Sequence, residues 1–269
     1  MMMIEQKYQQ LQHIVQDMES VLVAFSGGVD STLVAKVAYD ILGERAQAVT
    51  AWSEHYTEFN EQEFDELVKF LGIQHHTLKY TEFAIPHFQK NPPERCYFCK
   101  HYLFERFREF ADTYNAQYVV DGTNCDDSDD FRPGMKALQE LGIRSPLKEA
   151  GLTKDEVRIL SQRLHLPTWN KPSMPCLATR VPYGDEITPD VLRMIHEAET
   201  FLGRFSFAQL RVRHHGNLAR IEILRDDMVR VLNEHLDEQI VARLKEIGYT
   251  YVTLDLQGFR SGSLNEVLK

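Results

Sequence analysis

The hydrophobic pattern of the first half of the chain alternates between short apolar runs and amphipathic stretches. Residues 21–25 (VLVAF) are continuously apolar, which is typical of a strand buried on both faces. After the turn SGG, apolar residues recur every three or four positions, which predicts a helix. The alternation continues, with strands expected at 47–53, 74–80 and 118–120 and helices at 58–71 and from Cys96 to about Tyr114. This order predicts the α/β class with a doubly wound, mostly parallel sheet.

The pattern changes at a segment rich in proline. A last helix of the first half is expected from Lys154 to Leu164, where Thr153 and Glu156 form a plausible capping box. Residues 165–187 then look irregular. Beyond them the pattern predicts a helix at 190–202, strands at 209–214 and 219–224, one helix at 226–247 and a strand at 249–256. We therefore expect a domain at 1–165, a loop at 166–187 that carries Cys176, and a smaller C-terminal α+β domain at 188–269.

The turn after the first strand has the chemistry of an anion site. Free N–H groups at a helix start carry partial positive charge, and Gly27 and Gly28 let a phosphate approach the backbone. Ser26 and Ser31 add hydroxyl donors. Asp30 would repel a polyphosphate unless a divalent cation such as Mg²⁺ lay between them. Helix capping by Asp30 or Ser31 is the plainer interpretation, but it does not explain the two glycines.

A second polar turn follows the fourth expected strand. Ligands of open parallel sheets bind beyond the carboxyl ends of the strands, where the SGG turn and the turn DGTN both lie. We therefore take Gly122 and Thr123, together with Ser53 at the end of the second strand, as candidate nucleotide-binding residues. The aspartates at 126, 127, 129 and 130 are as consistent with a solvated loop as with a site.

Charge and composition limit the classes of partner. The chain has 30 basic and 40 acidic side chains, for a formal charge of −10, which argues against nucleic acid as a partner. The start of the chain lacks the hydrophobic core of a signal peptide, and no apolar stretch approaches the length of a membrane span. We therefore expect a cytoplasmic protein with no membrane partner. In such a reducing compartment, four cysteines are more typical of metal ligands or reactive thiols than of disulfides.

Three of these cysteines lie in distinctive contexts. Cys96 and Cys99 form a CxxC pair at an expected helix start, which suits half of a zinc site, a redox dithiol or an iron–sulfur site. Zinc would need further ligands, for which Cys125, Cys176 and His101 are available. Cys176 lies near Arg180, whose charge favours a thiolate. If Cys176 joins the pair, three thiolates bind a four-iron cluster and leave one iron open to carry sulfide.

A second basic site is predicted near the C-terminus. Arg211 and Arg213 alternate on an expected strand, so both side chains point to one face. Guanidinium groups bind phosphate with two parallel hydrogen bonds, which suits a mononucleotide substrate. The alternative is an exposed strand face with solvated arginines.

The segment SGGVDS after an apolar strand resembles the PP-loop of the ATP pyrophosphatases, Rossmann-like enzymes that split ATP into AMP and pyrophosphate. Neither GxxxxGK[ST] nor GxGxxG occurs in the chain. Over nearly its whole length the chain also resembles the LarE family of ATP-dependent sulfur transferases, which act in nickel-pincer nucleotide biosynthesis. The resemblance rests on the segments AFSGGVDSTLVAK, DGTNCDDSDDFRPGMKA, GIRSPLKEAGL, TWNKPSMPCLATRVPYG, RVRHHGNLARIEI and YVTLDLQGFRSG.

The resemblance implies a reaction and a set of residues. A carboxylate of pyridinium-3,5-biscarboxylic acid mononucleotide would be adenylated by ATP with Mg²⁺ and converted by sulfide to a thiocarboxylate. Ser26, Gly27, Gly28, Asp30 and Ser31 would hold pyrophosphate and magnesium. A [4Fe-4S] cluster would be ligated by Cys96, Cys99 and Cys176, and these three with Asp30 and Arg180 are the catalytic candidates. Arg211 and Arg213 would grip the substrate phosphate in a domain that also supports a homo-oligomer.

Two alternatives remain open in the sequence. Some family members sacrifice the sulfur of one cysteine, and Cys176 lies in the corresponding region. A PP-loop tRNA thiolase would share both the loop and the three cysteines.

Overall fold

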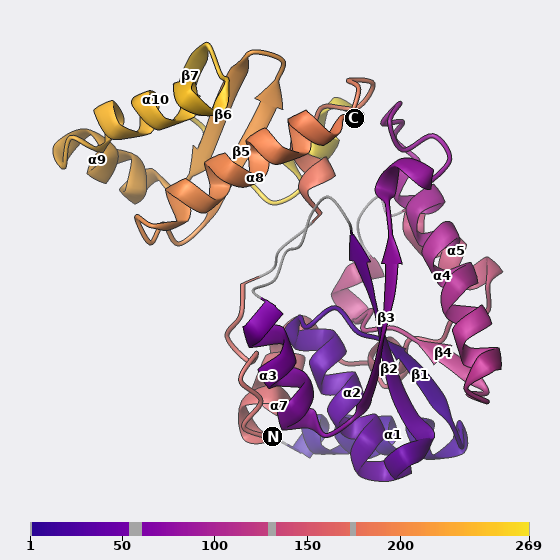
Figure 1. Ribbon diagram of the computed structural model, residues 1–269. Coiled ribbons are helices and arrows are strands. Elements are labelled where there is room, and N and C mark those ends of the chain that lie inside the picture. The colour runs from indigo at the N-terminus through magenta and orange to yellow at the C-terminus, as the bar shows by residue number, and fades with distance from the viewer. Residues whose placement is uncertain (1, 54–60, 129–132, 173–175, 269) are drawn as a thin grey trace. The chain divides into compact units, whose positions relative to one another are not determined.

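The structure is a computed structural model that describes residues 2–53, 61–128, 133–172 and 176–268 (Figure 1). The chain forms two compact units. The first contains Met1–Pro86 and Glu94–Met174, and the second contains His87–Pro93 and Pro175–Lys269.

The first unit is built on a parallel sheet, which confirms the predicted α/β class. Its strands are β1 (Val21–Ala24), β2 (Ala46–Ser53), β3 (Gln74–Tyr80) and β4 (Tyr118–Val120). They lie in the order β3-β2-β1-β4, and all three pairings are parallel. The chain therefore builds the sheet outward from β1 to β3 and then returns to place β4 on the other side of β1. The carboxyl ends of β1 and β4 flank the point where the strand order reverses, which is where open α/β sheets bind ligands.

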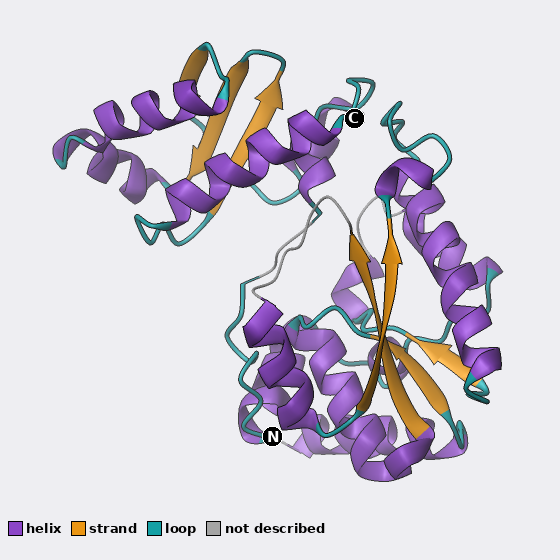
Figure 2. Ribbon diagram, in the orientation of Figure 1, coloured by secondary structure: helices purple, strands orange, loops and turns teal. Residues whose placement is uncertain are grey.

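Helices cover both faces of this sheet (Figure 2). They are α1 (Met2–Asp17), α2 (Val29–Leu42), α3 (Glu61–Leu71), α4 (Arg95–Thr113), α5 (Pro133–Glu140), α6 (Pro146–Glu149) and α7 (Lys154–Arg163). Val21 and Val23 of β1 join a core with α1, α2 and α7, whereas Leu22 packs into a second core with α4 and α5. Successive side chains of a strand point to opposite faces, so a strand covered on both faces must be apolar throughout.

The predicted start of α7 is confirmed. Thr153 Oγ1 accepts a hydrogen bond from Glu156 N, and the Glu156 side chain accepts one from Thr153 N, which completes the capping box. Part of the helix expected at 58–71 falls at 58–60, outside the described residues, and α3 is described from Glu61. Short 3₁₀ helices at Gly43–Arg45, Glu82–Ala84 and Cys125–Ser128 complete the first unit.

The second unit has its own sheet and core. Its elements are the 3₁₀ helix η4 (Leu177–Arg180), α8 (Pro189–Gly203), β5 (Leu210–His215), β6 (Leu218–Ile223), α9 (Arg225–Asn233), α10 (Leu236–Ile247), β7 (Tyr251–Leu254) and the 3₁₀ helix η5 (Ser263–Leu268). The strand order is β5-β6-β7, with β5 antiparallel and β7 parallel to β6. Residues 87–93 belong to this unit, where Asn91 Nδ2 donates to the carbonyls of Val181 and Pro182. The functions predicted for the two domains stay predictions.

The single helix expected at 226–247 is wrong, because the chain forms α9 and α10 instead. His235 lies between them with φ 54°, in the left-handed region. A left-handed residue cannot continue a right-handed helix. Both helices bury apolar residues in one core, including Val231 and Ile240, so the hydrophobic pattern runs on across the break.

None of the helices in the described part of the chain combines the length and apolar character that crossing a membrane requires.

Candidate functional site

The loop between β1 and α2 has the conformation that its two glycines predict. Gly27 has φ 65°, which favours glycine, and Gly28 is the N-cap of α2 without a side-chain cap. Ser31 ties the loop to the helix, since its Oγ accepts from Ser26 N at 3.2 Å and donates to Gly28 O at 3.3 Å. Ser26 Oγ lies 3.1 Å from Ser31 Oγ. The first turn of α2 thus starts in a tight loop with exposed Ser26 at its rim.

The turn after β4 lies against the start of α2. A Cβ on Gly122 would come within 2.8 Å of Ser31 N and 3.1 Å of the Asp30 carbonyl carbon, so only glycine allows this approach. Thr123 is buried, and its hydroxyl donates to Asp121 Oδ2 at 2.5 Å. The sheet therefore brings both predicted turns to one place, with Gly122 at the contact.

Asp30 is the centre of a polar cluster that the sequence did not predict. Its carboxylate forms an ion pair with the ammonium of Lys154, the first residue of α7. Its other oxygen accepts from Asn124 Nδ2 at 3.1 Å. Asp126 Oδ2 in turn accepts from Lys154 N at 2.9 Å. Lys154 and Asn124 lie more than ninety residues from Asp30 in sequence, so no local signal could have linked them.

Two further side chains lie near the carboxyl edge of the sheet. Ser53 ends β2 and is buried at 8% exposure, paired in register with Tyr80. Lys171 reaches the loop directly, with its Nζ donating to Gly27 O at 3.4 Å. Lys171 is a second cation that sequence reasoning missed.

The predicted cysteine pair lies at the start of α4. Cys96 and Cys99 are one helical turn apart, Cys96 exposed and Cys99 half-buried, and both carry thiols rather than a disulfide. The helix approaches α5 closely here, because a Cβ on Gly134 would lie 3.3 Å from Cys96 O. Cys125 is also a thiol, with Sγ 3.8 Å from Lys148 O.

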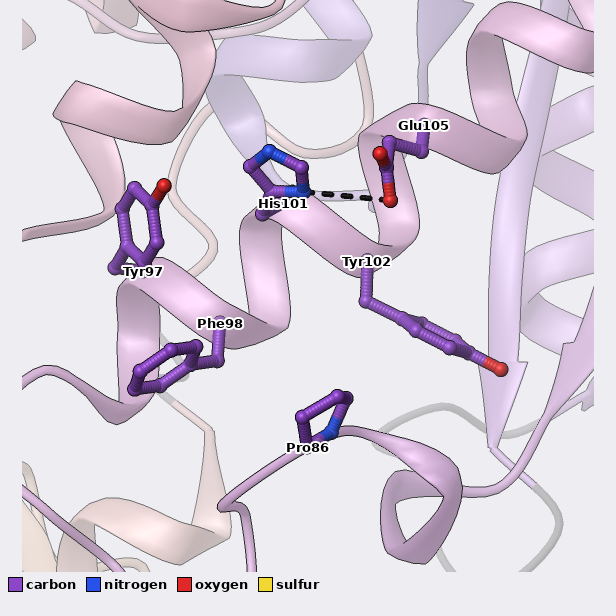
Figure 3. Close-up of a pocket in the computed structure, with 6 residues that line it drawn as sticks. All are labelled: Pro86, Tyr97, Phe98, His101, Tyr102 and Glu105. Atoms are coloured by element: carbon purple, nitrogen blue, oxygen red, sulfur yellow. Dashed lines mark ion pairs between the residues drawn. The ribbon is translucent and has the colours of Figure 1, made fainter.

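A small pocket of about 200 Å³ opens on the same helix (Figure 3). It is lined by Pro86, Tyr97, Phe98, His101, Tyr102 and Glu105. His101, a candidate zinc ligand in the sequence, instead has its Nδ1 3.3 Å from Glu105 Oε2. Within the residues that the structure describes, no group of three or more His, Cys, Asp or Glu side chains is placed to hold a metal ion.

Cys176 lies in the second unit, directly before η4. It is exposed, and its backbone carbonyl accepts from Arg180 Nη1 at 3.2 Å. Arg180 is buried and pairs with both carboxylate oxygens of Glu199, at 2.9 and 2.8 Å. Glu199 also accepts from Val212 N at 2.8 Å, so it connects the segment after Cys176 to β5.

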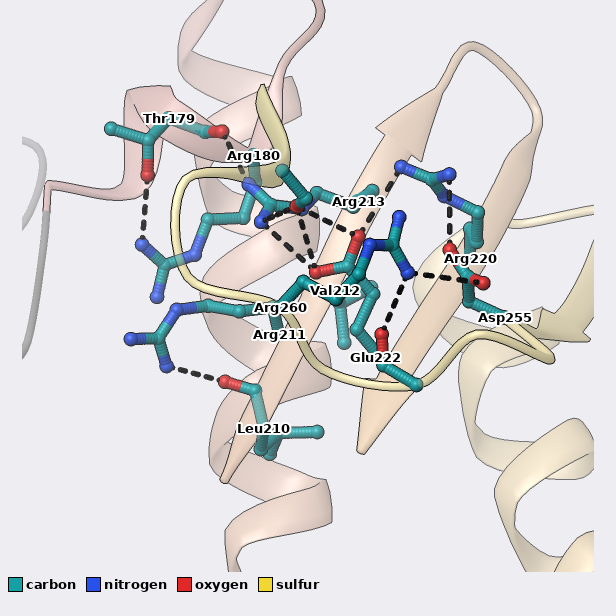
Figure 4. A network of polar contacts seen from close by, with 12 residues as sticks. Thr179, Arg180, Leu210, Arg211, Val212, Arg213, Arg220, Glu222, Asp255 and Arg260 are labelled. Carbon is teal, nitrogen blue, oxygen red and sulfur yellow. Dashed lines mark hydrogen bonds and ion pairs between the residues drawn. The ribbon is translucent and has the colours of Figure 1, made fainter. Parts of the chain in front are cut away.

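Arg211 and Arg213 both lie on β5, in different environments (Figure 4). Arg213 is buried and donates to Glu222 Oε2, Ser263 Oγ and Thr179 O at 2.7–2.9 Å. Arg211 is half-buried with its guanidinium 5.3 Å from the centre of the Phe259 ring. Burial and the nearby charges of Arg180 and Arg213 lower the pKa of Arg211 to about 10. These guanidinium groups form a local concentration of positive charge in an acidic protein.

The structure thus gathers the predicted residues in three places. Ser26, Gly27, Gly28, Asp30, Ser31, Gly122 and Thr123 meet at the carboxyl edge of the parallel sheet, with Ser53 at the end of β2. Cys96 and Cys99 lie on α4. Cys176, Arg180, Arg211 and Arg213 belong to the second unit. The roles assigned to these residues stay predictions.

Comparisons with known proteins agree with this arrangement. The NAD synthase family matches residues 3–127. An uncharacterized protein of Synechocystis sp. is 43% identical, with 99% of each chain covered. The pyridinium-3,5-bisthiocarboxylic acid mononucleotide synthase of Lactiplantibacillus plantarum is 40% identical, with 94% of this chain and 92% of that protein covered. One chain of the glutamine-hydrolyzing GMP synthase of Pyrococcus furiosus is 28% identical over 74% of this chain and 67% of its own length.

A parallel sheet with SGGVDS at its switch point and a match to NAD synthase define an ATP-using enzyme of the PP-loop class. Within that class, identity of 40% over nearly the full length is decisive. The chain belongs to the LarE family of ATP-dependent sulfur transferases.

Proposed function

We propose that this protein uses ATP to convert a carboxylate of pyridinium-3,5-biscarboxylic acid mononucleotide into a thiocarboxylate. The observation that carries the proposal is the 40% identity to the bisthiocarboxylic acid mononucleotide synthase across 94% of the chain. The SGGVDS loop at the switch point and the arginines of β5 support it.

The reaction has two steps. A carboxylate oxygen of the substrate attacks the α-phosphorus of ATP, and pyrophosphate leaves. Sulfide then attacks the acyl carbon, and AMP leaves with the carboxylate oxygen. A carboxylate resists nucleophiles, whereas the mixed anhydride with AMP has a good leaving group. The protein therefore has to bind two phosphate-bearing molecules and a source of sulfur.

The loop residues are assigned to ATP. The backbone N–H groups at the start of α2 and the Ser26 hydroxyl would hold the pyrophosphate end. Asp30 has the carboxylate chemistry that Mg²⁺ binds, and in the structure it neutralises Lys154. With Mg²⁺ on Asp30, the ammonium of Lys154 would be released to contact a phosphate oxygen. Gly122 and Thr123 would form the adjacent wall.

Arg211 and Arg213 are assigned to the substrate phosphate. Arg213 is anchored by Glu222, which leaves Arg211 as the more adaptable of the two. The depressed pKa of Arg211 is caused by burial and by neighbouring guanidinium charge. A phosphate dianion would relieve that repulsion, so the same environment favours anion binding.

Cys96, Cys99 and Cys176 are assigned to a [4Fe-4S] cluster. All three carry thiols on exposed or half-buried side chains, which iron and sulfide can reach. A cluster held by three thiolates leaves one iron to carry an added sulfide, which supplies the sulfur. Arg180 fixes the backbone of Cys176 through its carbonyl.

Anaerobic reconstitution with iron and sulfide tests this assignment. We expect brown protein that turns over repeatedly with ATP, Mg²⁺ and sulfide, and releases pyrophosphate only when the dicarboxylate nucleotide is present. Cys96→Ser, Cys99→Ser and Cys176→Ser variants should each lose iron and turnover. The matched control is Cys125→Ser, which should keep both.

Three results would contradict the cluster. Colourless protein with tightly bound zinc would assign the cysteines to a structural metal. A single turnover with conversion of Cys176 to dehydroalanine would assign them to sacrificial chemistry. Full turnover in the Cys96→Ser variant would remove the CxxC pair from the reaction.

A further inference from the structure

The peptide that leads into the nucleotide loop is held by side chains on both of its edges. This peptide joins Phe25 to Ser26, one residue beyond the end of β1. Its carbonyl, Phe25 O, accepts a hydrogen bond from Thr50 Oγ1 of β2 at 2.6 Å. Its amide, Ser26 N, donates to Ser31 Oγ at 3.2 Å. A peptide is planar, so two bonds on opposite edges fix the orientation of the whole unit.

Thr50 takes over a bond at the place where the chain leaves the sheet. Phe25 N still donates to Val49 O at 2.8 Å, in continuation of the pairing of β1 with β2. The loop departs after this bond, and a buried carbonyl needs a donor. The Thr50 hydroxyl, on a side chain only 4% exposed, supplies it.

Proton counting then determines the state of His75. A carbonyl cannot donate, so Thr50 gives its only hydroxyl proton to Phe25 O. His75 Nε2 of β3 lies 2.9 Å from Thr50 Oγ1, and this hydrogen bond requires a proton on Nε2. Burial, with a smaller effect of neighbouring His76, lowers the pKa of His75 to about 4. The ring is therefore neutral near pH 7, with its proton on Nε2.

The His75 ring is itself fixed by aromatic packing. It lies edge-on to Phe25 at 6.2 Å and to Phe64 at 5.3 Å between ring centres. Phe25 and Phe64 are both nearly fully buried and pack on each other at 5.5 Å. A series of contacts thus runs from β3 through β2 to the residue that precedes the loop.

We propose that Thr50 and His75 are positioning residues that orient the Phe25–Ser26 peptide and so hold the loop in the form that binds ATP phosphates. Neither residue is part of the loop, and neither is assigned to contact the nucleotide. The inference rests on the proposed function, because it takes the loop to be the ATP site. A buried pair on β2 and β3 thereby affects nucleotide binding without touching the nucleotide.

The test compares ATP affinity with stability in four full-length variants. Thr50→Val removes the hydroxyl at nearly constant volume, and Thr50→Ser keeps it. His75→Phe keeps an aromatic ring but removes the donor. The matched control is His76→Phe, because His76 is the next residue of β3 and bonds Gln47 at 2.7 Å, away from Thr50. Mg-ATP binding is measured by calorimetry, and the free energy of unfolding by urea titration.

We expect Thr50→Val and His75→Phe to weaken ATP binding by about three- to tenfold, the value of one hydrogen bond. Thr50→Ser should bind like the wild type, and His76→Phe should keep its ATP affinity whatever its stability. The double variant Thr50→Val/His75→Phe should bind about as weakly as either single variant, because both act through one bond. Nitrogen NMR of the wild type should show the His75 proton on Nε2.

Two outcomes would overturn the inference. One is ATP binding by Thr50→Val and His75→Phe equal to that of the wild type. The other is a loss of affinity in His76→Phe as large as in His75→Phe, which would make the effect a general loss of fold. A wild-type chain that does not bind ATP would instead contradict the proposed function, so the two failures are distinguishable.

Discussion

Ser31 shows how one side chain can both build and occupy a site. Its hydroxyl accepts from Ser26 N and donates to Gly28 O, so it closes the loop on itself. Its backbone N belongs to the first turn of α2, where N–H groups point at an anion. The side chain of Ser31 is 4% exposed. Its contribution to ATP binding is therefore expected to come chiefly through the shape of the loop and the backbone.

Gly122 carries the first prediction at the residue scale. Gly122→Ala would place a methyl group 2.8 Å from a backbone nitrogen that cannot move without shifting α2. We expect a loss of about 1–3 kcal/mol in the free energy of unfolding, together with weaker ATP binding. Urea unfolding and an ATP titration measure the two effects.

The control for this variant is Gly203→Ala at the end of α8. A Cβ there meets nothing within 4 Å, so alanine should be tolerated. If Gly122→Ala proved as stable as Gly203→Ala and bound ATP normally, the close contact between the turn and α2 would be wrong.

At the scale of elements, α7 matters because its first residue is Lys154. The capping box of Thr153 and Glu156 fixes the start of this helix, and Lys7 Nζ of α1 lies 2.7 Å from Glu156 Oε2. Lys154 then projects to Asp30 beside the loop. The cap of one helix thereby sets the position of a charge at the start of another.

Removing this cap should affect both stability and nucleotide binding. Thr153→Ala is expected to cost about 1 kcal/mol of unfolding free energy, the usual value of an N-cap. It should also weaken ATP binding, since Lys154 follows the cap directly. Calorimetry of Mg-ATP binding and urea unfolding are the measurements.

Thr188→Ala offers a matched comparison. Thr188 caps α8 through a bond from Val191 N at 3.2 Å, and it belongs to the second unit. Its loss should cost a similar free energy of unfolding and leave ATP affinity unchanged. Equal ATP affinity in the two variants would separate Lys154 from the nucleotide site.

At the scale of the whole molecule, charge bears on the choice of substrate. The chain carries 40 acidic and 30 basic side chains, and its basic residues at β5 and β6 include arginines paired with carboxylates such as Glu222 and Asp255. Phosphate-backbone binding depends on unneutralised basic surface and falls steeply with salt. A tRNA thiolase needs such a surface, whereas a mononucleotide needs only a local one.

We therefore expect a flat response when the protein is titrated with tRNA at low salt. The same protein should respond to the dicarboxylate nucleotide under identical conditions. A tRNA complex that dissociates with increasing salt would favour the tRNA thiolase alternative and count against the proposed substrate.

Local patterns were sufficient for much of the first unit. The apolar run at 21–25, the SGGVDS turn and the capping box at Thr153 each lie within a few consecutive residues, so their conformations follow from short-range physics. The alternation of strands and helices was enough to predict a parallel sheet. The break at His235 was missed because both flanking helices bury the same kind of face.

The sequence by itself determined the class of fold and the loop, because periodicity, glycine conformation and helix capping act between near neighbours. The tertiary structure alone decided that Gly122 touches the start of α2, that Lys154 pairs with Asp30, and that Glu222 takes up Arg213. Each of these contacts joins residues on different elements, and only the order of strands in the sheets brings them together. The Thr50–His75 pair belongs to this second group, since strand register places a histidine of β3 against a threonine of β2.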